Sequence, residues 1–361
     1  MDTDQRVIEY KCPCCGAALA FSSDLQKLAC ASCNNTFDID AVQAYNKSLN
    51  QESTTNVEWE ESTTSQWTDE EQHTMQIFIC PSCGGEILSD AHTVATFCPY
   101  CENPAIIPGR LSKGLKPDAL IPFQTTRDDA RNAFLTFCKG KPLLPKGYTE
   151  ETRIEKITGL YVPFWLYDCT CQTRSQYRAT RVHHWSDSRF HYTRTDHFLL
   201  IRNADAAFSR IPMDGSSKIQ DEIMESIEPF DYSQMTNFNT AYLSGFFADK
   251  YDMDAKSGEE RIRQRVNITM DEEIAKTCVG YATVVPGVRQ NHIQQGKAKY
   301  VLLPVWMLHT RYRDKTYIFA MNGQTQKMTG TLPCCPKRSA AWFAGLFAGL
   351  TVLATLMQYW L

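Results

Sequence analysis

Eight of the fifteen cysteines in this chain form two copies of one pattern that can bind a metal ion. In each copy, two Cys-x-x-Cys pairs are separated by fourteen residues. A tight Cys-x-x-Cys turn directs two thiolates at one point, so two such turns supply the four tetrahedral sulfurs of a structural zinc site. The eight predicted zinc ligands are Cys12, Cys15, Cys30 and Cys33 in the first copy and Cys80, Cys83, Cys98 and Cys101 in the second.

The two copies also share a first turn of the form Cys-Pro-x-Cys-Gly, at residues 12–16 and 80–84. Aligning these turns leaves Cys14 as a spare cysteine. Four cysteines close the coordination sphere, so we expect two structural zinc ions that stabilise small modules and take no part in catalysis. Iron in a rubredoxin-like site is the alternative metal. Disulfides or a chance spacing are the alternatives to a metal site.

The remaining cysteines and the N-terminus bear on the cellular compartment. Seven cysteines are left over, an odd number without regular spacing, which is unlike a disulfide framework. Zinc-binding thiolates also need an environment that does not oxidise them to disulfides. Residues 1–10 are polar and no apolar segment follows, so no signal peptide is predicted. We therefore expect most of the chain to lie in the reducing cytosol.

Charge is distributed unevenly along the chain. Residues 1–109 contain 4 Lys and Arg against 16 Asp and Glu, a net charge of −12, whereas residues 110–336 contain 31 against 25, a net charge of +6. No Lys or Arg occurs between Lys47 and Arg110, a stretch that includes the whole second cysteine module. A nucleic-acid-binding module needs cations to neutralise phosphates. The charge therefore opposes such a role for the second module.

The elements that must position these residues form an α+β multidomain chain. We expect a zinc ribbon at residues 1–45, an acidic flexible linker at 46–75, a second zinc ribbon at 76–108, a mixed α/β body at 110–332 and a transmembrane helix at 340–361. The linker contains two tryptophans, which either form a short docking motif or have no partner.

The body is predicted to contain both helices and strands. Apolar spacing predicts helices at Asp128–Lys139, at Ser216–Ile227 behind a serine cap, and at Glu259–Cys278 with a break near Asn267. Strands are predicted at residues 159–174, 175–184, 190–203, 300–312 and 316–321. Asn322-Gly323 is typical of a hairpin turn.

Two strand segments of the body resemble each other. Residues 160–167 have the sequence LYVPFWLY, and residues 301–308 have the sequence VLLPVWML. A proline before the body of a strand suits an entry or edge position. We expect a duplicated β-rich core built on these Pro-x-Trp strands, and chance recurrence of Pro-x-Trp is the alternative.

The C-terminal segment has the features of a membrane span. Residues 340–361 carry no charge and would extend about 33 Å as a helix, enough for a hydrocarbon core of about 30 Å. Trp342 and Trp360 lie near its two ends, as interfacial aromatics do. Lys337 and Arg338 precede it, and the positive-inside rule places that end in the cytosol. The alternative is a buried C-terminal helix.

Small residues and cysteines near this span suggest further contacts. Gly345 and Gly349 form a Gly-x-x-x-Gly motif that would allow close helix–helix packing and a homo-oligomer. Cys334 and Cys335 lie where acylated cysteines are found, although plain thiols are the simpler interpretation.

The sequence shows no catalytic constellation, and its most suggestive surface is a predicted hairpin at residues 174–202. We find no Gly-rich phosphate loop, no His-Glu-x-x-His and no Gly-x-Ser-x-Gly, and we interpret the histidines at 183, 184, 191 and 197 as surface residues. Aromatic residues alternate with arginines in the hairpin, a pattern that suits nucleic acid, anionic lipid or plain solvent exposure; the lipid interpretation is favoured. The arginines are Arg174, Arg178, Arg181, Arg189, Arg194 and Arg202.

The layout resembles a bacterial family of TFIIB-type zinc ribbon-containing membrane proteins. The resemblance covers nearly the full chain and rests on the tandem Cys-Pro-x-Cys-Gly turns, the two Pro-x-Trp segments, the residues around Asn322-Gly323 and the terminal anchor. It implies a membrane-anchored accessory protein, often encoded beside phage-shock protein PspA and SPFH-like partners in envelope-stress systems. It implies no catalytic residues.

These features support one leading hypothesis and two others. The leading hypothesis is a non-enzymatic, tail-anchored membrane adaptor whose cytosolic zinc ribbons dock membrane-associated protein partners. The second is a membrane-tethered nucleic-acid-binding protein that uses the arginine and aromatic hairpin. The third is an enzyme with a site in the α/β body.

Overall fold

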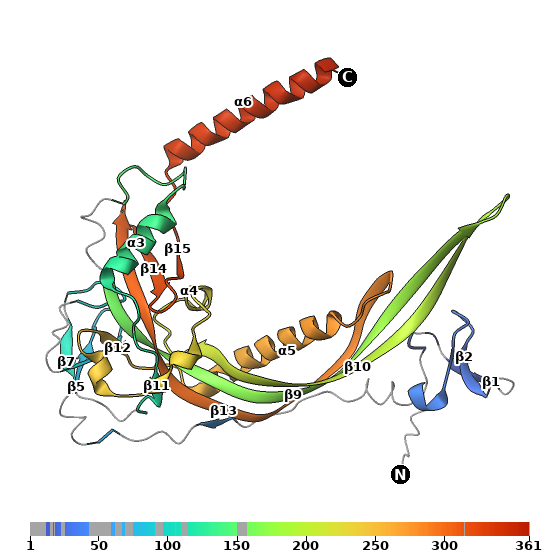
Figure 1. The fold of residues 1–361 in the computed structure, drawn as a ribbon, viewed down its shortest axis with the longest axis horizontal. Coiled ribbons are helices and arrows are strands. Elements are labelled where there is room, and N and C mark those ends of the chain that lie inside the picture. Colours follow the sequence, from blue (N-terminus) through green and yellow to red (C-terminus); the bar gives the residue numbers. More distant parts are fainter. Residues whose placement is uncertain are drawn as a thin grey trace, which may run out of the picture. The chain divides into compact units, whose positions relative to one another are not determined.

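The protein has a sheet-rich α+β fold that ends in one apolar helix (Figure 1). The computed structural model describes residues 12–14, 17, 19–22, 26–42, 59–61, 67–68, 75–90, 97–104, 106–109, 115–149, 157–313 and 315–360. The chain divides into two compact units. The first comprises Met1–Glu60, Tyr167–Ile211 and Glu259–Lys297, and the second comprises Glu61–Leu166, Pro212–Gly258 and Ala298–Leu361.

Three long strands contribute to both units. They are β9 (Ile157–Ser186), β10 (His191–Asp214) and β13 (Thr283–Tyr312). The sequence predicted shorter strands in these regions and divided β9 in two. The distal half of β9 continues as a strand because many of its buried side chains alternate with exposed or half-buried ones, which suits a sheet with one solvated face, whereas the distal half of β10 is mostly exposed.

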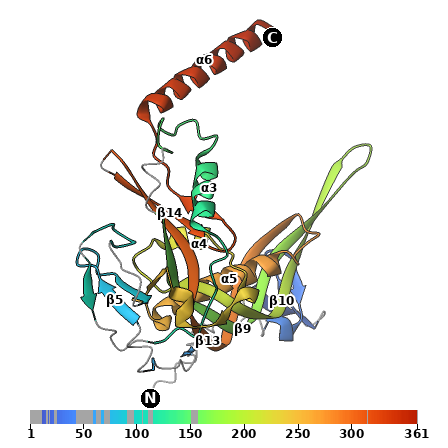
Figure 2. The ribbon, with the colours of Figure 1, turned by 60° about the vertical axis from the view of Figure 1, so that its left-hand side comes forward.

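In the first unit, the distal half of β9 lies beside β13 and a helix covers them. The hydroxyl of Thr170 donates to the carbonyl of Gln294 at 3.4 Å, and the hydroxyls of Thr180 and Thr283 are 2.6 Å apart, so the two strands run antiparallel. Helix α5 (Glu259–Ala275) lies along one face of these strands (Figures 1 and 2). The predicted break near Asn267 is absent.

The second unit is built on a mixed sheet. Its strands follow the order β11, β8, β13, β9, β12, β6, β5, β7. In addition, β14 pairs with β13, and β15 pairs with β14. The short strands are β5 (Met75–Ile79), β6 (Glu86–Asp90), β7 (Ile107–Gly109), β8 (Ala119–Leu120), β11 (Thr236–Asn237), β12 (Phe247–Asp249), β14 (Lys315–Asn322) and β15 (Met328–Gly330).

Two helices of the second unit show how local signals compete with tertiary contacts. Helix α3 (Arg127–Cys138) forms close to its predicted bounds because Thr126 and Asp129 make a capping box at its start. Helix α4 covers only Asp221–Ser226, five residues later than predicted. The backbone amide and hydroxyl of Ser217 bond to the Asp252 carboxylate instead, at 2.7 and 2.6 Å, and hold the preceding residues in a turn.

The two Pro-x-Trp segments have matching surroundings. In β9, Leu160 and Tyr161 pair with the parallel strand β12; in β13, the equivalent residues Val301 and Leu302 pair with the parallel strand β8. These are the contacts expected of a duplicated unit.

Backbone hydrogen bonds around two glycines extend this match. Gly215 donates to the carbonyl of Pro163 at 2.7 Å, and Gly323 donates to the carbonyl of Pro304 at 2.8 Å. Each glycine carbonyl then accepts from two successive amides of the loop that follows the short parallel strand. Those amides belong to Asp252 and Met253 for Gly215, and to Gln124 and Thr125 for Gly323. The hairpin predicted at Asn322-Gly323 does form between β14 and β15, with the amide of Asn322 donating to the carbonyl of Lys327 at 2.9 Å, but its connection is longer than a two-residue turn.

Helix α6 (Pro336–Trp360) ends the chain. It begins four residues before the predicted span, with proline in the first helical position that proline favours. An 18-residue window within Pro336–Gln358 has a mean hydropathy of 1.8, and none of that window is buried by the residues that the structure describes. One C-terminal helix is therefore long and apolar enough to cross a membrane. Its start is held by a bond from the amide of Cys335 to the carbonyl of Leu143, at 2.9 Å.

Candidate metal centres

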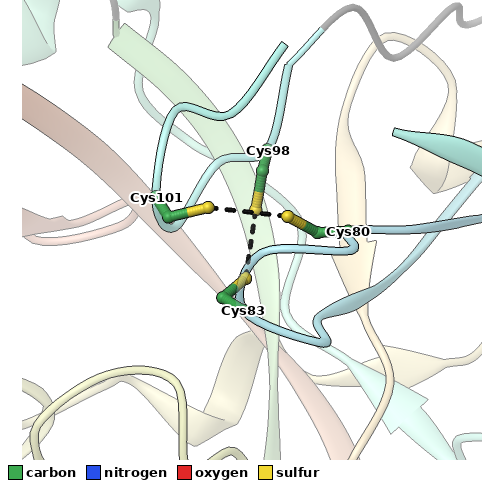
Figure 3. A group of neighbouring side chains, drawn as sticks. All are labelled: Cys80, Cys83, Cys98 and Cys101. Atoms are coloured by element: carbon green, nitrogen blue, oxygen red, sulfur yellow. Dashed lines mark hydrogen bonds between the residues drawn. The ribbon is translucent and has the colours of Figure 1, made fainter. Parts of the chain in front are cut away.

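The second cysteine module brings four sulfurs to one point (Figure 3). The Cys80 and Cys101 sulfurs are 3.5 Å apart, the Cys83 and Cys98 sulfurs are 3.6 Å apart, and all four lie within 4.8 Å of one another. Zinc–sulfur bonds of about 2.3 Å in a tetrahedron place the sulfurs about 3.8 Å apart. The donor set and its spacing therefore fit a structural zinc ion.

Two tight backbone turns hold these sulfurs. In the first turn, the amide of Gly84 donates to the carbonyl of Cys80 at 2.8 Å, and Gly84 has a φ of 70°. In the second, Glu102 makes the same bond to Cys98 at 2.9 Å with a φ of 58°. The turn requires a left-handed residue directly after the second cysteine, which explains the glycine in Cys-Pro-x-Cys-Gly.

The protein environment does not favour four free thiolates in this module. Burial raises the pKa of the Cys98 and Cys83 thiols. Burial also opposes ionisation of Cys80, but the backbone amides of Cys83 and Ser82 donate to its sulfur and lower its pKa to about 7. A dication at the centre of the cluster would supply the missing stabilisation, since zinc binds the thiolate form.

The first cysteine module repeats this geometry over the residues that the structure describes. Cys12, Cys30 and Cys33 form a group that could hold a metal ion, with the Cys12 and Cys33 sulfurs 3.6 Å apart. Asn34 donates to the carbonyl of Cys30 at 2.9 Å and has a φ of 55°, as Gly84 does in the other module. The fourth predicted ligand, Cys15, lies outside the described residues, and Cys14 is half-buried outside the group.

The second module is continuous with the body sheet. Leu88 and Ile87 of β6 pair with Ala248 and Asp249 of β12, in antiparallel register. The Lys250 ammonium lies 2.7 Å from the Glu86 carboxylate beside this junction. The buried cysteines of the module also share a core with the first Pro-x-Trp strand. That core includes Phe78, Cys80, Ile87, Cys98, Tyr100, Leu160, Val162 and Phe164. This candidate metal centre therefore forms part of the body.

A buried carboxyl beside the second module is a feature that sequence reasoning missed. Asp249 is only 2% exposed, and this burial raises its pKa to about 7 although Ser216 and Tyr100 favour its ionised form. Tyr100 lies between the ligands Cys98 and Cys101 in the chain, and burial raises its pKa well above the usual value. No motif marks Asp249, because its partners are distant in sequence.

The predicted arginine hairpin forms, but several of its arginines bind the protein itself. Arg181 lies over the rings of Phe198 and Tyr281, with its guanidinium 5.3 Å from each centroid, and donates to the carbonyl of Gly280. Arg194 is paired with Asp196 at 3.1 Å. Arg202 bonds to Thr277, whereas Arg174 is half-buried. Arg178 and Arg189 are exposed in the hairpin.

The remaining predicted site residues lie around α6 and in the linker. Gly345 and Gly349 are exposed on α6, with no neighbouring side chain within 4 Å of an added methyl group. The Arg338 guanidinium donates to the carbonyl of Leu144. Both linker tryptophans contact rings of the body: Trp59 packs edge-on against Tyr167, and Trp67 against Phe238.

Comparisons with known proteins identify a relative but give no activity. No protein-family model and no solved structure matches this chain. The chain is 36% identical over 350 residues to a protein of Bacillus subtilis (strain 168) named "Uncharacterized protein YdjG", and the match covers 96% of each chain.

Proposed function

This chain belongs to the YdjG family, and we propose that it is a non-enzymatic, tail-anchored membrane adaptor whose metal-stabilised modules dock protein partners in the cytosol. The observation that carries the proposal is α6, an apolar helix of membrane-spanning length whose most apolar window is not buried by any of the residues that the structure describes. A helix of this composition needs an apolar environment, and a bilayer supplies one of matching thickness.

The charges at the start of α6 support a cytosolic N-terminal side. Lys337 and Arg338 precede the apolar segment, and no charged residue follows it to the C-terminus of this sequence. Cationic residues are retained on the cytosolic side of a span. The cysteine modules would then lie in a reducing compartment, where their thiols can bind zinc.

The metal modules support a docking role because they are closed and carry exposed apolar side chains. Four sulfurs leave no open coordination position for a substrate. Phe21 is 53% exposed on the first module, where Ile39 is also exposed. On the second module, Ile79 and Ile107 face each other across β5 and β7 and are both exposed. Exposed apolar pairs on small modules are suited to protein partners.

The class of partner follows from the resemblance of the sequence to zinc ribbon-containing membrane proteins. We propose partners of the PspA or SPFH-like type in an envelope-stress complex. Two copies of the chain would pack through Gly345 and Gly349, because small residues let membrane helices approach closely. Nucleic-acid binding through the hairpin is the alternative, but the internal contacts of Arg181 and Arg194 reduce the charge available for phosphates.

Affinity purification from detergent-solubilised membranes tests the docking role. We would compare the proteins captured by the full chain with those captured by a Phe21→Ser variant. Ile268→Ser is the matched control, because Ile268 is an exposed isoleucine of α5 and is not a residue of either cysteine module. The proposal predicts that Phe21→Ser loses a specific membrane partner that Ile268→Ser retains. An unchanged set of partners in Phe21→Ser and in a Cys30→Ser, Cys33→Ser variant would contradict it.

A further inference from the structure

The tip of the β9–β10 hairpin exposes three large aromatic side chains. The paired ends of the two strands extend beyond α5 (Figures 1 and 2). There, Trp185 is 51% exposed, Phe190 is 62% exposed and Tyr192 is 38% exposed. Keeping this much aromatic surface in water is unfavourable, and clustered exposed apolar groups mark an interaction site.

The tip is held in a defined conformation. One oxygen of the Asp187 carboxylate accepts from the amides of Arg189 and Phe190, both at 2.8 Å, and the other accepts from the Tyr192 hydroxyl at 2.9 Å. The rings of Trp185 and Tyr192 stack with centroids 5.4 Å apart and planes 10° apart. These aromatic groups are therefore already ordered, which lowers the entropic cost of binding.

The chemistry of the tip favours a lipid surface over nucleic acid. Tryptophan and tyrosine combine an apolar ring with a polar group and are enriched where a bilayer meets water. Arg189 lies in the turn itself, where its cation can meet a lipid phosphate. A nucleic acid would need the arginines further along the strands, but Arg181 and Arg194 are engaged by the protein.

We propose that the tip formed by Trp185, Phe190 and Tyr192 inserts into the interfacial region of an anionic bilayer and gives the chain a second membrane contact. This inference rests on the proposed membrane anchoring, because α6 would keep the hairpin within reach of a bilayer at high effective concentration. The tip then adds to the membrane affinity of the chain, although on its own it would bind a bilayer only weakly and reversibly, as single shallow anchors do.

Fluorescence of the full chain in lipid vesicles tests the proposal. The protein would be reconstituted in vesicles of phosphatidylglycerol with a phosphatidylcholine that carries bromine on its acyl chains. Subtracting the emission of a Trp185→Phe variant from that of the wild type isolates Trp185. We expect the Trp185 emission to shift to shorter wavelength and to be quenched by the brominated lipid. Emission typical of water and insensitive to bromine would overturn the proposal.

A second variant tests separately whether α6 inserts into the bilayer. Trp342 lies at the start of α6, and the same subtraction with Trp342→Phe reports on insertion of that helix. Quenching of Trp342 without quenching of Trp185 would overturn the hairpin contact alone. If neither is quenched, the membrane adaptor itself is contradicted. A Trp185 that responds to added single-stranded RNA but not to brominated lipid would assign the tip to nucleic acid and overturn the lipid contact.

Discussion

Cys98 is fully buried and its sulfur lies within 4.8 Å of three others, so its replacement tests whether the second module binds a metal ion. We expect a Cys98→Ser variant of the full chain to bind about one zinc ion fewer per chain, since a hydroxyl is a poor replacement for a thiolate ligand. The body should also lose stability, because the module shares its core. Elemental analysis of the purified protein measures the zinc content and distinguishes zinc from iron.

The control for this change is Cys334→Ser, at an exposed cysteine outside both groups. This variant should keep the metal content of the wild type. A Cys98→Ser variant with undiminished metal content would show that the cluster is not a metal centre.

Because of Asp249, the free energy of unfolding should fall as the pH rises. An ordinary salt-bridged carboxylate has the opposite effect. The folded-state pKa of Asp249, about 7, lies above the usual unfolded value of about 3.9. The folded protein therefore binds this proton more tightly, and the stability that the carboxyl contributes below pH 4 is lost as the pH rises through 7. Relative to Asp249→Asn, the wild type should lose on the order of 4 kcal/mol of unfolding free energy across this range.

Urea unfolding of the wild type and of Asp249→Asn at pH 5 and pH 8 measures this effect. The difference in unfolding free energy between the two proteins should favour the variant more strongly at pH 8. Comparing the two proteins at each pH cancels the titration of the cysteine ligands. A difference that does not change with pH would refute the assignment.

At the scale of elements, we predict different effects of substitution at Gly215 and Gly323, the two glycines that bond in the same way to the two Pro-x-Trp segments. A methyl group at Gly323 would lie 2.7 Å from the Phe123 ring and 2.8 Å from Pro304, whereas at Gly215 the closest atoms are 3.3 Å away or more. The Phe123 ring cannot move freely, because it is stacked on Phe246. Gly323→Ala should therefore destabilise the protein by about 1–3 kcal/mol, and Gly215→Ala by clearly less.

Thermal unfolding of both glycine variants, with the wild type as reference, measures the two losses. Because both positions make the same backbone hydrogen bonds, the comparison isolates the effect of packing. Equal losses at the two positions would contradict this account of the repeat.

The sequence predicted those elements whose signals are local. The Cys-Pro-x-Cys-Gly turn encodes its own left-handed residue, Thr126 and Asp129 cap α3, and the uncharged C-terminal segment forms one helix. Contacts between distant residues were not predictable in this way. The backbone amide of Ser217 donates to the Asp252 carboxylate, and α4 begins later as a result. The pairing of β6 with β12 joins the second module to the body. Neither contact leaves a pattern within its own segment.

At the scale of the whole molecule, the two cysteine modules differ in their setting. The second module is a continuation of the body sheet, with β5, β6 and β7 at one end of the strand order. Its metal centre should therefore matter for the folding of the body. The first module forms its own three-stranded sheet, of β1 (Leu19–Ser22), β2 (Lys27–Cys30) and β3 (Thr36–Phe37). Variants of the first module are thus the cleaner probes of partner docking.

The central claim is that α6 crosses the membrane and holds the rest of the chain in the cytosol. Protease treatment of sealed membrane vesicles, with a tag at the N-terminus of the full chain, tests this claim most directly. The account predicts that the chain stays with the membrane after alkaline carbonate extraction. It also predicts that the tag is digested in inside-out vesicles and protected in right-side-out vesicles. Release by carbonate, or a tag protected in inside-out vesicles, would contradict it.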